Sequence, residues 1–496
     1  MSVRSPETNR PPGTDASGPR SLRPLAGVLT AMAVSLTGTR ISAVALPWFV
    51  LVTTGSATRT GLVAFCEMAP YVLVKAFAGP LIDRTGPRTV SWTTDSVSAA
   101  AVGLVPLLHA LDLLTFPLLL ALVAVVGAVR GPGDLAKEVM VPEAAEHGRV
   151  PLERATGMSG VAERLASTAG PAAGGTLVAL TGPMAGLVVN AVSFALGSVI
   201  IALFLPRGTG HGSGHGTGHG GAADQGQEGA PADGKEPGYW RRLGEGFAFL
   251  KRDRLLLTVI AMISVTNLLD AAFQTVLVPV WAKEYGGGPA AIGLVGSVWG
   301  TAAVGGSLIA TAVAHRLRRR TVLFTGFLLA GAPRFLALAL DAPMWAVLAV
   351  FAVGGFGAGF LNPILGAVLF ERVPRRLLGR VGALGDSLSW AGIPLGGLAG
   401  GAAVAAVGIG PVLVTAGALY FLTTTLTGLR PEWREADRQR EAARAGKAPA
   451  ADIPTADTPT TGPPGAAPPG PRSRDPEESG PPERAAGPGV GAATPG

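Results

Sequence analysis

The chain has 496 residues, of which 48% are hydrophobic and only 15% are charged, whereas soluble chains carry about 25% charged residues. Charge is concentrated in the two ends, one central segment and short clusters, and the apolar stretches between them can each cross roughly 30 Å of hydrocarbon. This composition excludes an ordinary soluble globule, and the single cysteine, Cys66, excludes an internal disulfide or a multi-cysteine metal site.

The first residues, 1–23, are polar and lack the apolar core of a signal peptide, so we expect a disordered cytoplasmic tail. Twelve apolar segments follow, at 25–51, 60–82, 89–110, 114–133, 155–180, 184–206, 255–281, 290–314, 321–340, 343–369, 378–406 and 411–429. They predict an all-α integral membrane protein with twelve transmembrane helices in two six-helix bundles. The expected parts after the tail are an N-terminal bundle at 24–206, a cytoplasmic linker at 207–254, a C-terminal bundle at 255–430 and a disordered cytoplasmic tail at 431–496.

Lys and Arg are distributed unevenly over the predicted loops. With the N-terminus inside, the outer loops hold only Arg59 and Lys283. The cytoplasmic loops then hold Arg84, Arg88, Arg149, Arg154, Arg316, Arg318, Arg319, Arg320, Arg372, Arg375, Arg376 and Arg380. Because positive loops stay on the cytoplasmic side, we expect both termini inside a bacterial cell membrane. The same distribution explains the net charge of +7 without a nucleic-acid partner.

Three histidines recur in the central segment, at His211, His215 and His219. Their spacing allows weak metal binding, but a flexible low-complexity linker is the simpler interpretation. We therefore predict neither a metal site nor a cofactor.

Comparison of the chain with itself reveals an internal repeat. An offset of 232 residues aligns Val44-Ala45-Leu46-Pro47 with Val276-Leu277-Val278-Pro279, and Arg84 with Arg316. Further on, an offset of 223 aligns Pro171 with Pro394 and Glu163 with Asp386. Two pseudo-symmetric halves in the same orientation suit alternating access, in which the halves rock about a midplane site between them.

The loop after the second apolar segment, 79–88, has the sequence GPLIDRTGPR. It resembles the signature loop of the major facilitator superfamily, Gly-x-x-x-Asp-Arg-x-Gly-Arg-Lys/Arg, and so implies that fold. In this interpretation Gly79 permits close helix packing, Gly86 allows a tight turn, and Asp83 latches the inward face shut by capping a helix or pairing with an arginine. A purely topogenic basic loop is the alternative. The expected gating residues are Gly79, Asp83, Arg84, Gly86, Arg88 and Arg130.

The fifth apolar segment carries small residues and a proline at Gly157, Gly170, Pro171, Gly174 and Gly175. The pattern resembles the antiporter motif of the same superfamily, which implies an exporter that exchanges substrate for protons. Pro171 is expected to kink the helix, and the small residues are expected to pack tightly against a neighbour. Generic packing through small residues is the alternative.

Two stretches narrow the resemblance further. The runs Val44-Ala45-Leu46-Pro47 and Arg130-Gly131-Pro132 are similar to the branch that holds macrolide-efflux and enterobactin-exporter-like proteins. The resemblance extends over roughly residues 22–430. That branch often has an acidic residue after the glycine of the first helix, where this chain has Gly38-Thr39-Arg40.

Charged residues within apolar segments cost about 2.5–3.5 kcal/mol each to insert, so they usually face a cavity or a partner. The candidates are Arg40, Glu67, Lys75, Asp95, Glu163, Arg164, Asp270, Arg334 and Asp386. Because a low-dielectric site favours the neutral form of a carboxylate, we expect Glu67 or Asp270 to carry a coupled proton, with Arg40 as the partner of Glu67. A gating network with Arg130 is expected for Asp95, Glu163, Arg164 and Asp386. Structural ion pairs between helices are the alternative throughout.

The leading hypothesis is a monomeric, proton-coupled exporter of small organic molecules such as antibiotics. A siderophore or metabolite exporter is the alternative within transport, and a transporter-derived membrane sensor or scaffold is the alternative from another class. The sequence contains no nucleophile–base constellation and no nucleotide-binding loop, so it predicts neither an enzyme nor an ATP-driven pump.

Overall fold

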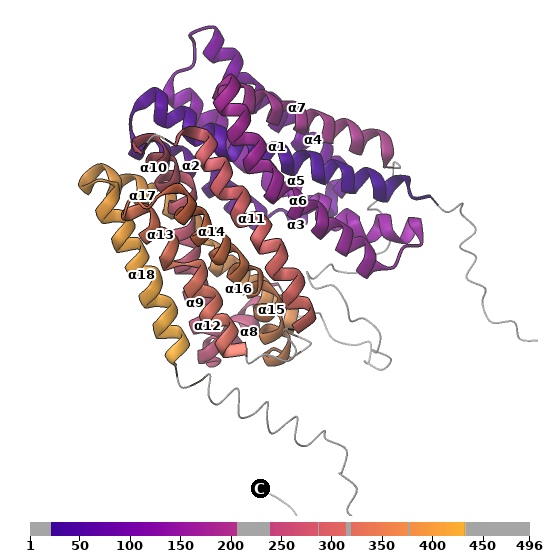
Figure 1. The fold of residues 1–496 in the computed structure, drawn as a ribbon. Helices are drawn as coiled ribbons and strands as arrows, with labels where there is room; N and C mark the ends of the chain where they lie inside the picture. The colour runs from indigo at the N-terminus through magenta and orange to yellow at the C-terminus, as the bar shows by residue number, and fades with distance from the viewer. Residues whose placement is uncertain are drawn as a thin grey trace, which may run out of the picture. The chain divides into compact units, whose positions relative to one another are not determined.

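The computed structural model describes residues 21–205, 239–285, 287–313, 319–374, 377–430 and 432. Within these ranges the chain is helical and contains no strand (Figure 1). Most of both predicted tails and the three linker histidines lie outside the described residues, as do Arg316, Arg318, Arg375 and Arg376.

The first half of the chain forms α1 (Arg23–Thr54), α2 (Ala57–Ala76), α3 (Gly79–Thr85), α4 (Pro87–Ala110), α5 (Phe116–Gly148), α6 (Leu152–Thr181) and α7 (Pro183–Phe204). The second half begins with α8 (Tyr239–Arg252), α9 (Arg254–Ala272), the π-helix η1 (Phe273–Leu277), α10 (Val278–Glu284), α11 (Gly288–Val313) and α12 (Arg319–Ala330). It continues with α13 (Ala332–Ala339), α14 (Met344–Gly359), α15 (Leu361–Arg372), α16 (Leu378–Trp390), α17 (Ile393–Val407) and α18 (Ile409–Leu429). Each predicted apolar segment coincides with one helix or with a run of consecutive helices.

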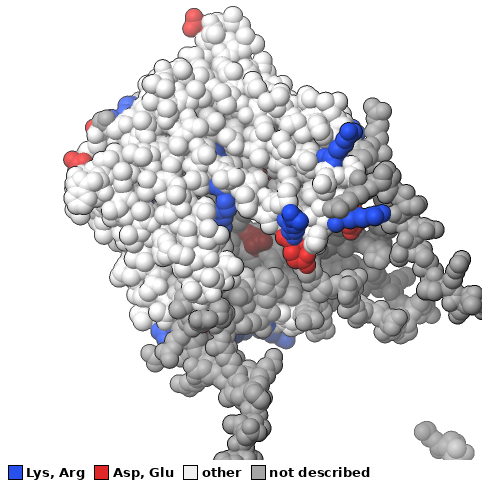
Figure 2. Space-filling view, turned by 45° about the vertical axis from the view of Figure 1, so that its right-hand side comes forward, with Lys and Arg blue, Asp and Glu red and all other residues white. Residues whose placement is uncertain are grey.

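Most of these helices can span a membrane. Among the described residues, nine helices are long and apolar enough, and the pair α2 and α3, bent by 64°, makes a tenth. The other two of the expected twelve are α4 and α6, which have 24 and 30 residues and pack against neighbouring spans. Figure 2 shows a broad face with few charged side chains, as contact with hydrocarbon requires. The described part of the chain is therefore consistent with twelve membrane helices.

The fourth of these helices is longer than predicted. The sequence indicated an end at residue 133, whereas α5 continues to Gly148 with Pro132 and Pro142 inside it. Its 33 residues extend over about 50 Å, so the helix is longer than the apolar layer is thick. Asp134 and Lys137 consequently lie on a helix and not in a loop.

The helices of each half pack mainly with one another, which gives two bundles. In the first half, α1 packs against α6 and α7, α2 against α5, and α4 against α5 and α7. In the second half, α11 packs against α14, α9 against α17, and α13 against α18. A large buried cluster lies mostly in the second half and includes Phe273, Phe335 and Leu413, and it extends to Val44 and Leu51 of the first half.

The end of the predicted linker forms α8. This helix packs against α9 and α16, where buried Leu250 joins Ile260 and Val381 in one apolar cluster. The linker thus ends in an element that is attached to the second bundle.

The two halves meet through α2 with α17 and through α6 with α11. A methyl group on Gly61 would lie 2.2 Å from the carbonyl oxygen of Gly397. One on Gly175 would lie 2.6 Å from the carbonyl oxygen of Pro289. Since no larger side chain fits at these points, the glycines determine how closely the halves approach.

Two hydrogen bonds also join the halves near the point where α1 and α10 end. Lys283 Nζ donates to the Leu51 carbonyl oxygen at 3.1 Å, and Thr58 Oγ1 donates to the Gly401 carbonyl oxygen at 3.3 Å. Near the opposite end of the interface helix α6, a methyl group on Gly157 would have no neighbour within 4 Å in the part of the chain that the structure describes. The observed bonds therefore close the halves at the end that carries Lys283.

Candidate functional site

Three ion pairs join different helices in the interior of the bundles: Glu67 with Arg130, Asp95 with Lys137, and Asp270 with Arg334. Charged side chains inside a membrane protein usually mark an ion path or a binding site. Of these six residues, Lys137 is the one that the sequence analysis missed, because the predicted fourth helix ended before it.

Glu67 on α2 and Arg130 on α5 meet where a glycine brings the helices together. A methyl group on Gly127 would lie 2.0 Å from the Glu67 carbonyl oxygen. Arg130 Nη1 donates to Glu67 Oε1 at 2.9 Å, and Arg130 Nε lies 3.7 Å from Asp134 Oδ2. The Arg130 guanidinium also lies 4.7 Å from the centre of the Tyr71 ring. Arg130 is thus surrounded by two carboxylates and one aromatic ring.

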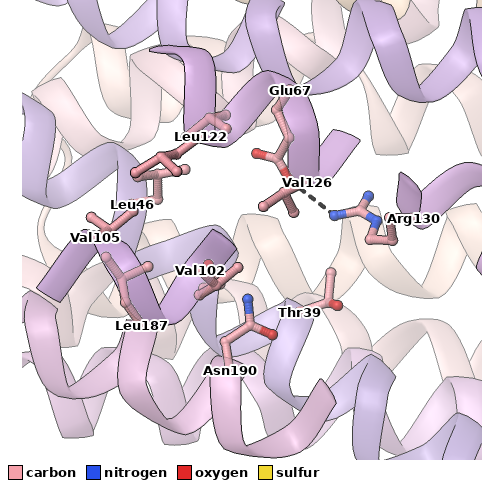
Figure 3. Close-up of a pocket in the computed structure, with 12 residues that line it drawn as sticks. Thr39, Leu46, Glu67, Val102, Val105, Leu122, Val126, Arg130, Leu187 and Asn190 are labelled. Atoms are coloured by element: carbon pink, nitrogen blue, oxygen red, sulfur yellow. Dashed lines mark hydrogen bonds and ion pairs between the residues drawn. The ribbon is translucent and has the colours of Figure 1, made fainter. Parts of the chain in front are cut away.

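This ion pair lies at the wall of a hollow in the first bundle that is open to solvent, and the empty space of about 410 Å³ there includes part of that solvent. Figure 3 shows Glu67 and Arg130 on one side and Asn190 on another, with valine and leucine side chains between them. Asn190 Oδ1 is buried and has no hydrogen-bond partner among the described residues. A mostly apolar cavity with a few polar groups at its wall is typical of a small-molecule site.

The predicted pairing of Glu67 with Arg40 is wrong. Arg40 lies on α1 against α6, since a methyl group on Gly170 would lie 2.4 Å from Arg40 Cβ. The carboxylate that attracts Arg40 most strongly is Glu163 on α6, whereas Glu67 bonds to Arg130 from α5. The rotation of α1 about its own axis points Arg40 toward α6 and not toward Glu67 on α2. Sequence spacing does not reveal this rotation.

The predicted gating network around Arg130 is wrong for Asp95, and the membership of its other three residues stays a prediction. Arg130 bonds to Glu67 and lies near Asp134. Asp95 pairs instead with Lys137. The remaining expected members, Glu163, Arg164 and Asp386, have exposed side chains on α6 and α16.

Asp95 on α4 and Lys137 on α5 form the most buried of the three pairs. Their Oδ1 and Nζ atoms lie 2.8 Å apart, and their side chains are 4% and 3% exposed. Lys137 also donates to Ser35 Oγ at 3.3 Å. A methyl group on Gly197 would lie 2.5 Å from Ser35 Oγ and 2.9 Å from Asp95 Oδ2, so that glycine makes room for the cluster.

Asp270 and Arg334 form the corresponding pair of the second bundle. Arg334 Nη2 on α13 donates to Asp270 Oδ1 on α9. The Arg334 side chain is only 5% exposed, whereas that of Asp270 is 30% exposed. The Asp270 side chain is therefore partly accessible to solvent, whereas its arginine partner is not.

In the predicted signature loop, the structure supports one glycine role and overturns the other. Gly86 has φ 84°, a backbone conformation that permits the tight turn between α3 and α4. Gly79 does not serve close packing, because a methyl group there would meet no atom of the described residues within 4 Å. Asp83 and Arg84 are exposed and have no ion-pair partner among the described residues, so the expected latch is open in this structure. Arg88 Nη2 donates to the Ala202 carbonyl oxygen at 2.6 Å.

For the antiporter-like pattern on α6, the structure likewise supports some of the expected packing roles and overturns another. Gly170 and Gly174 face α1, and Gly175 faces α11 of the second half, all in contacts too close for a side chain. No described atom lies within 4 Å of a methyl group built on Gly157, which corrects its expected role in tight packing. Pro171 lies inside a continuous helix, and its carbonyl oxygen would be 2.5 Å from a methyl group on Gly293. Pro171 and Gly175 therefore form part of the interface between the halves, whereas Gly170 and Gly174 pack within the first bundle.

Comparison with known proteins agrees with this architecture. The sequence profile of the Major Facilitator Superfamily matches residues 28–269 and 260–458. The multidrug efflux pump Tap of Mycobacterium tuberculosis (strain ATCC 25618 / H37Rv) is 31% identical over 422 residues, which are 83% of this chain and 94% of the pump. The multidrug efflux pump Tap of Mycolicibacterium fortuitum is 27% identical over 418 residues, 84% of this chain and 97% of the pump.

The crystal structure of the nucleoside transporter NupG has the same fold, with a TM-score of 0.59 at 15% identity over 82% of this chain and 98% of NupG. At that identity the likeness concerns the fold alone. The superfamily profile, in contrast, spans more than half of the chain. Together with the two bundles and the relatives along almost their full length, this match shows that the chain belongs to the Major Facilitator Superfamily of membrane transporters.

Proposed function

We propose that this chain exports drug-like organic molecules from a bacterial cell in exchange for protons. The observation that carries the proposal is the 31% identity to the Tap multidrug efflux pump along 94% of that pump's length. As a member of a transporter superfamily, the chain is a multi-pass membrane transporter and not an enzyme. The same kinship favours transport over a sensor or scaffold, and a siderophore or metabolite exporter is the competing substrate assignment.

The proposal includes an orientation with both termini in the cytoplasm and a monomer as the working unit. It is supported by Arg84, Arg88 and Arg149 near one end of the bundles and by the two cations Arg59 and Lys283 at the other. In this orientation the halves are closed on the outer side, and substrate enters from the cytoplasm. The partners are a small molecule, protons and the bilayer, without nucleic acid.

The coupled proton requires a carboxylate whose neutral form the protein tolerates. Removing one partner of a buried ion pair costs about 3–5 kcal/mol when the other charge is left uncompensated. A carboxylate that repeatedly gains and loses a proton therefore needs a partner cation with further stabilising contacts. The three interior ion pairs differ in this respect.

Glu67 meets the requirement. When Glu67 is neutral, its partner Arg130 retains Asp134 at 3.7 Å and the Tyr71 ring at 4.7 Å. A cation–π contact of this kind contributes about 0.5–2 kcal/mol. Arg130 thus keeps most of its stabilisation, and Glu67 also lines the cavity of the first bundle.

The partner cation of Asp270 also has further stabilising contacts, whereas that of Asp95 does not. Arg334 lies within 4.6–5.8 Å of four aromatic ring centres, which remain when Asp270 is neutral. Lys137, in contrast, keeps only the Ser35 hydroxyl among its described partners when Asp95 is neutral. We therefore assign the coupled protons to Glu67 and Asp270, and a structural role to Asp95.

Everted membrane vesicles that accumulate ethidium under a respiratory proton gradient test the function. Glu67→Gln and Asp270→Asn are each expected to reduce gradient-driven uptake about tenfold, equivalent to about 1.4 kcal/mol, and the double variant to abolish it. Glu284→Gln, at the exposed end of α10, is the matched control.

A protonophore should stop uptake by the wild-type protein. Full gradient-driven uptake by the double variant would contradict the assignment of the two carboxylates. If no compound of an antibiotic panel were transported, while an iron-free siderophore were, the substrate assignment would pass to the siderophore alternative.

A further inference from the structure

Arg334 lies in a cage of aromatic side chains that come from four helices. The ring centres of Phe273, Trp299, Phe335 and Tyr420 lie 4.6, 4.8, 5.2 and 5.8 Å from its guanidinium carbon. These residues belong to η1, α11, α13 and α18. Among the described residues Asp270 is the ion-pair partner of this cation, and aromatic rings supply the rest of its environment.

Arg334 leaves one of its buried hydrogen-bond donors unused. Its Nη2 donates to Asp270, but its buried Nε has no hydrogen-bond partner among the described residues. A guanidinium of purely structural function normally satisfies its donors with carbonyl or carboxylate oxygens. An arginine held by ring faces can instead change its distance to one carboxylate without breaking a set of directional bonds.

One wall of the cage is also part of the contact between the halves. Trp299 precedes Gly300, and a methyl group on Gly300 would lie 3.0 Å from Thr168 Cα and 3.1 Å from the Ser167 carbonyl oxygen of α6. Ser167 is four residues before Pro171, which has no N–H to donate to that carbonyl. The cage therefore adjoins the interface at a turn of α6 that lacks one helical hydrogen bond.

Trp299 has little freedom to move independently of its surroundings. A methyl group on Gly355 would lie 2.4 Å from the Trp299 carbonyl oxygen, and one on Gly354 would lie 2.8 Å from Trp299 Cζ3. The π-helical turn η1, which supplies Phe273, follows Asp270 closely, and such turns are often found at functional sites. A shift of Arg334 would thus be transmitted to the backbone of α11.

We propose that the aromatic cage holds Arg334 while Asp270 is neutral and that Trp299 transmits the charge state of Asp270 to the α6–α11 interface. The proposal rests on the assignment of Asp270 as a proton carrier. Neutralising Asp270 lets the guanidinium settle onto the rings, and the displaced Trp299 loosens the contact of Gly300 with Thr168. Trp299 is a positioning residue in this scheme and touches neither proton nor substrate.

The charged and titratable groups around the carboxylate are few. Among the described residues, Arg334 from α13 and Tyr420 from α18 are those that interact electrostatically with Asp270. The other elements packed against α9 add nothing to this set: α17 and η1 contain no titratable side chain, and no group of α8 or α16 is among those that interact with Asp270. The pH response of the cage is therefore the response of Asp270.

The test compares Trp299→Leu, which removes a ring of the cage, with Trp299→Phe, which keeps one. Trp345→Leu on α14, a tryptophan with 74% exposure, is the control for loss of an indole. With one ring fewer, the neutral state of Asp270 is less well tolerated, so the pH midpoint of gradient-driven ethidium uptake should move about one unit toward acid, a tenfold change in proton affinity. Trp299→Phe and Trp345→Leu should keep the wild-type midpoint.

A second measurement follows the interface itself. In a Cys66→Ser background, the rate at which N-ethylmaleimide modifies Thr168→Cys is divided by its rate at Thr156→Cys, an exposed position on the same helix, because this division cancels the lower thiolate fraction in acid. The ratio should be higher in acidic than in alkaline buffer, and Trp299→Leu should remove most of this difference. An unchanged midpoint in Trp299→Leu would overturn the cage, and an unchanged labelling difference would overturn the transmission through Trp299. If Asp270→Asn retained full proton drive, the proton-carrier assignment itself would fail, which separates the two proposals.

Discussion

At the scale of single residues, what surrounds a cation distinguishes an ion pair that can open from one that cannot. Arg130 and Arg334 have aromatic rings as additional neighbours, whereas Lys137 is paired with Asp95 in a site where both side chains are almost fully buried. A buried pair of this kind contributes little net stability, but its half-removal leaves a charge without compensation. Stability measurements can therefore identify the structural pair.

Lys137→Met should destabilise the protein by about 3–5 kcal/mol, because the Asp95 carboxylate would remain buried alone. The double variant with Asp95→Asn should recover most of this loss. Lys75→Met removes another lysine–carboxylate pair of the same bundle, whose glutamate is 53% exposed, and should cost about 0–1 kcal/mol. Unfolding of the detergent-solubilised protein in increasing SDS measures all three, and equal losses for Lys137→Met and Lys75→Met would contradict the structural role.

At the scale of helices, the glycines of α6 differ in function although they belong to one sequence pattern. Gly175 lies against Pro289 and Gly293 of α11, and Gly157 has free space around it. The pattern alone does not reveal this difference, since it depends on which face of α6 the second bundle covers. The two positions offer a matched pair of substitutions on the same helix.

Gly175→Ala should reduce transport about tenfold or more, since an added methyl group 2.6 Å from a backbone oxygen forces α6 and α11 apart. Gly157→Ala should leave transport unchanged and stabilise α6 slightly, by about 0.5–1 kcal/mol, through higher helix propensity. Ethidium uptake by vesicles with equal amounts of each variant decides the question. Loss of transport in both variants would indicate that the motif acts through something other than this interface.

The sequence predicts those features that depend on local hydropathy, and it does not predict those that depend on contacts between distant segments. The membrane segments could be predicted to within a few residues because insertion depends on local hydropathy. The true end of α5 could have been found too, since Ala136, Met140 and Ala144 recur at every fourth position beyond Pro132, as in a helix. The partners of Glu67 and Asp95 could not, because the rotation of α1, α2 and α5 depends on glycine contacts between distant segments.

At the scale of the whole molecule, the internal repeat and the closure of the two halves are directly related. Lys283 and Leu51, which form a hydrogen bond across the halves, are separated by 232 residues, the same offset that aligns the two repeats. Equivalent positions of a repeat can touch only near the axis that relates them. The bond therefore lies near the axis that relates the repeats, at the outer end of the halves. It is asymmetric, since one repeat supplies the cation and the other the carbonyl at a helix end.

This asymmetry makes Lys283 the expected outer lock. Its ammonium group neutralises the negative end of α1, where Gly55 N–H bonds to the same Leu51 oxygen. Lys283→Gln should weaken closure by about 0.3–1 kcal/mol, which shifts the population of outward-open molecules about two- to fivefold. Arg59→Gln is the control, because Arg59 stacks on Phe116 within its own half at 5.2 Å.

The shift can be measured with a membrane-impermeant maleimide applied from outside to Ser56→Cys in a Cys66→Ser background. Labelling should be faster with Lys283→Gln than with Arg59→Gln, and high salt should reduce the difference because it screens the charge at the helix end. If both variants were labelled at the wild-type rate, the bond between Lys283 and Leu51 would have no part in closure. The glycine contacts between α2 and α17 would then hold the outer side by packing alone, and the two repeats would contribute equally to the lock.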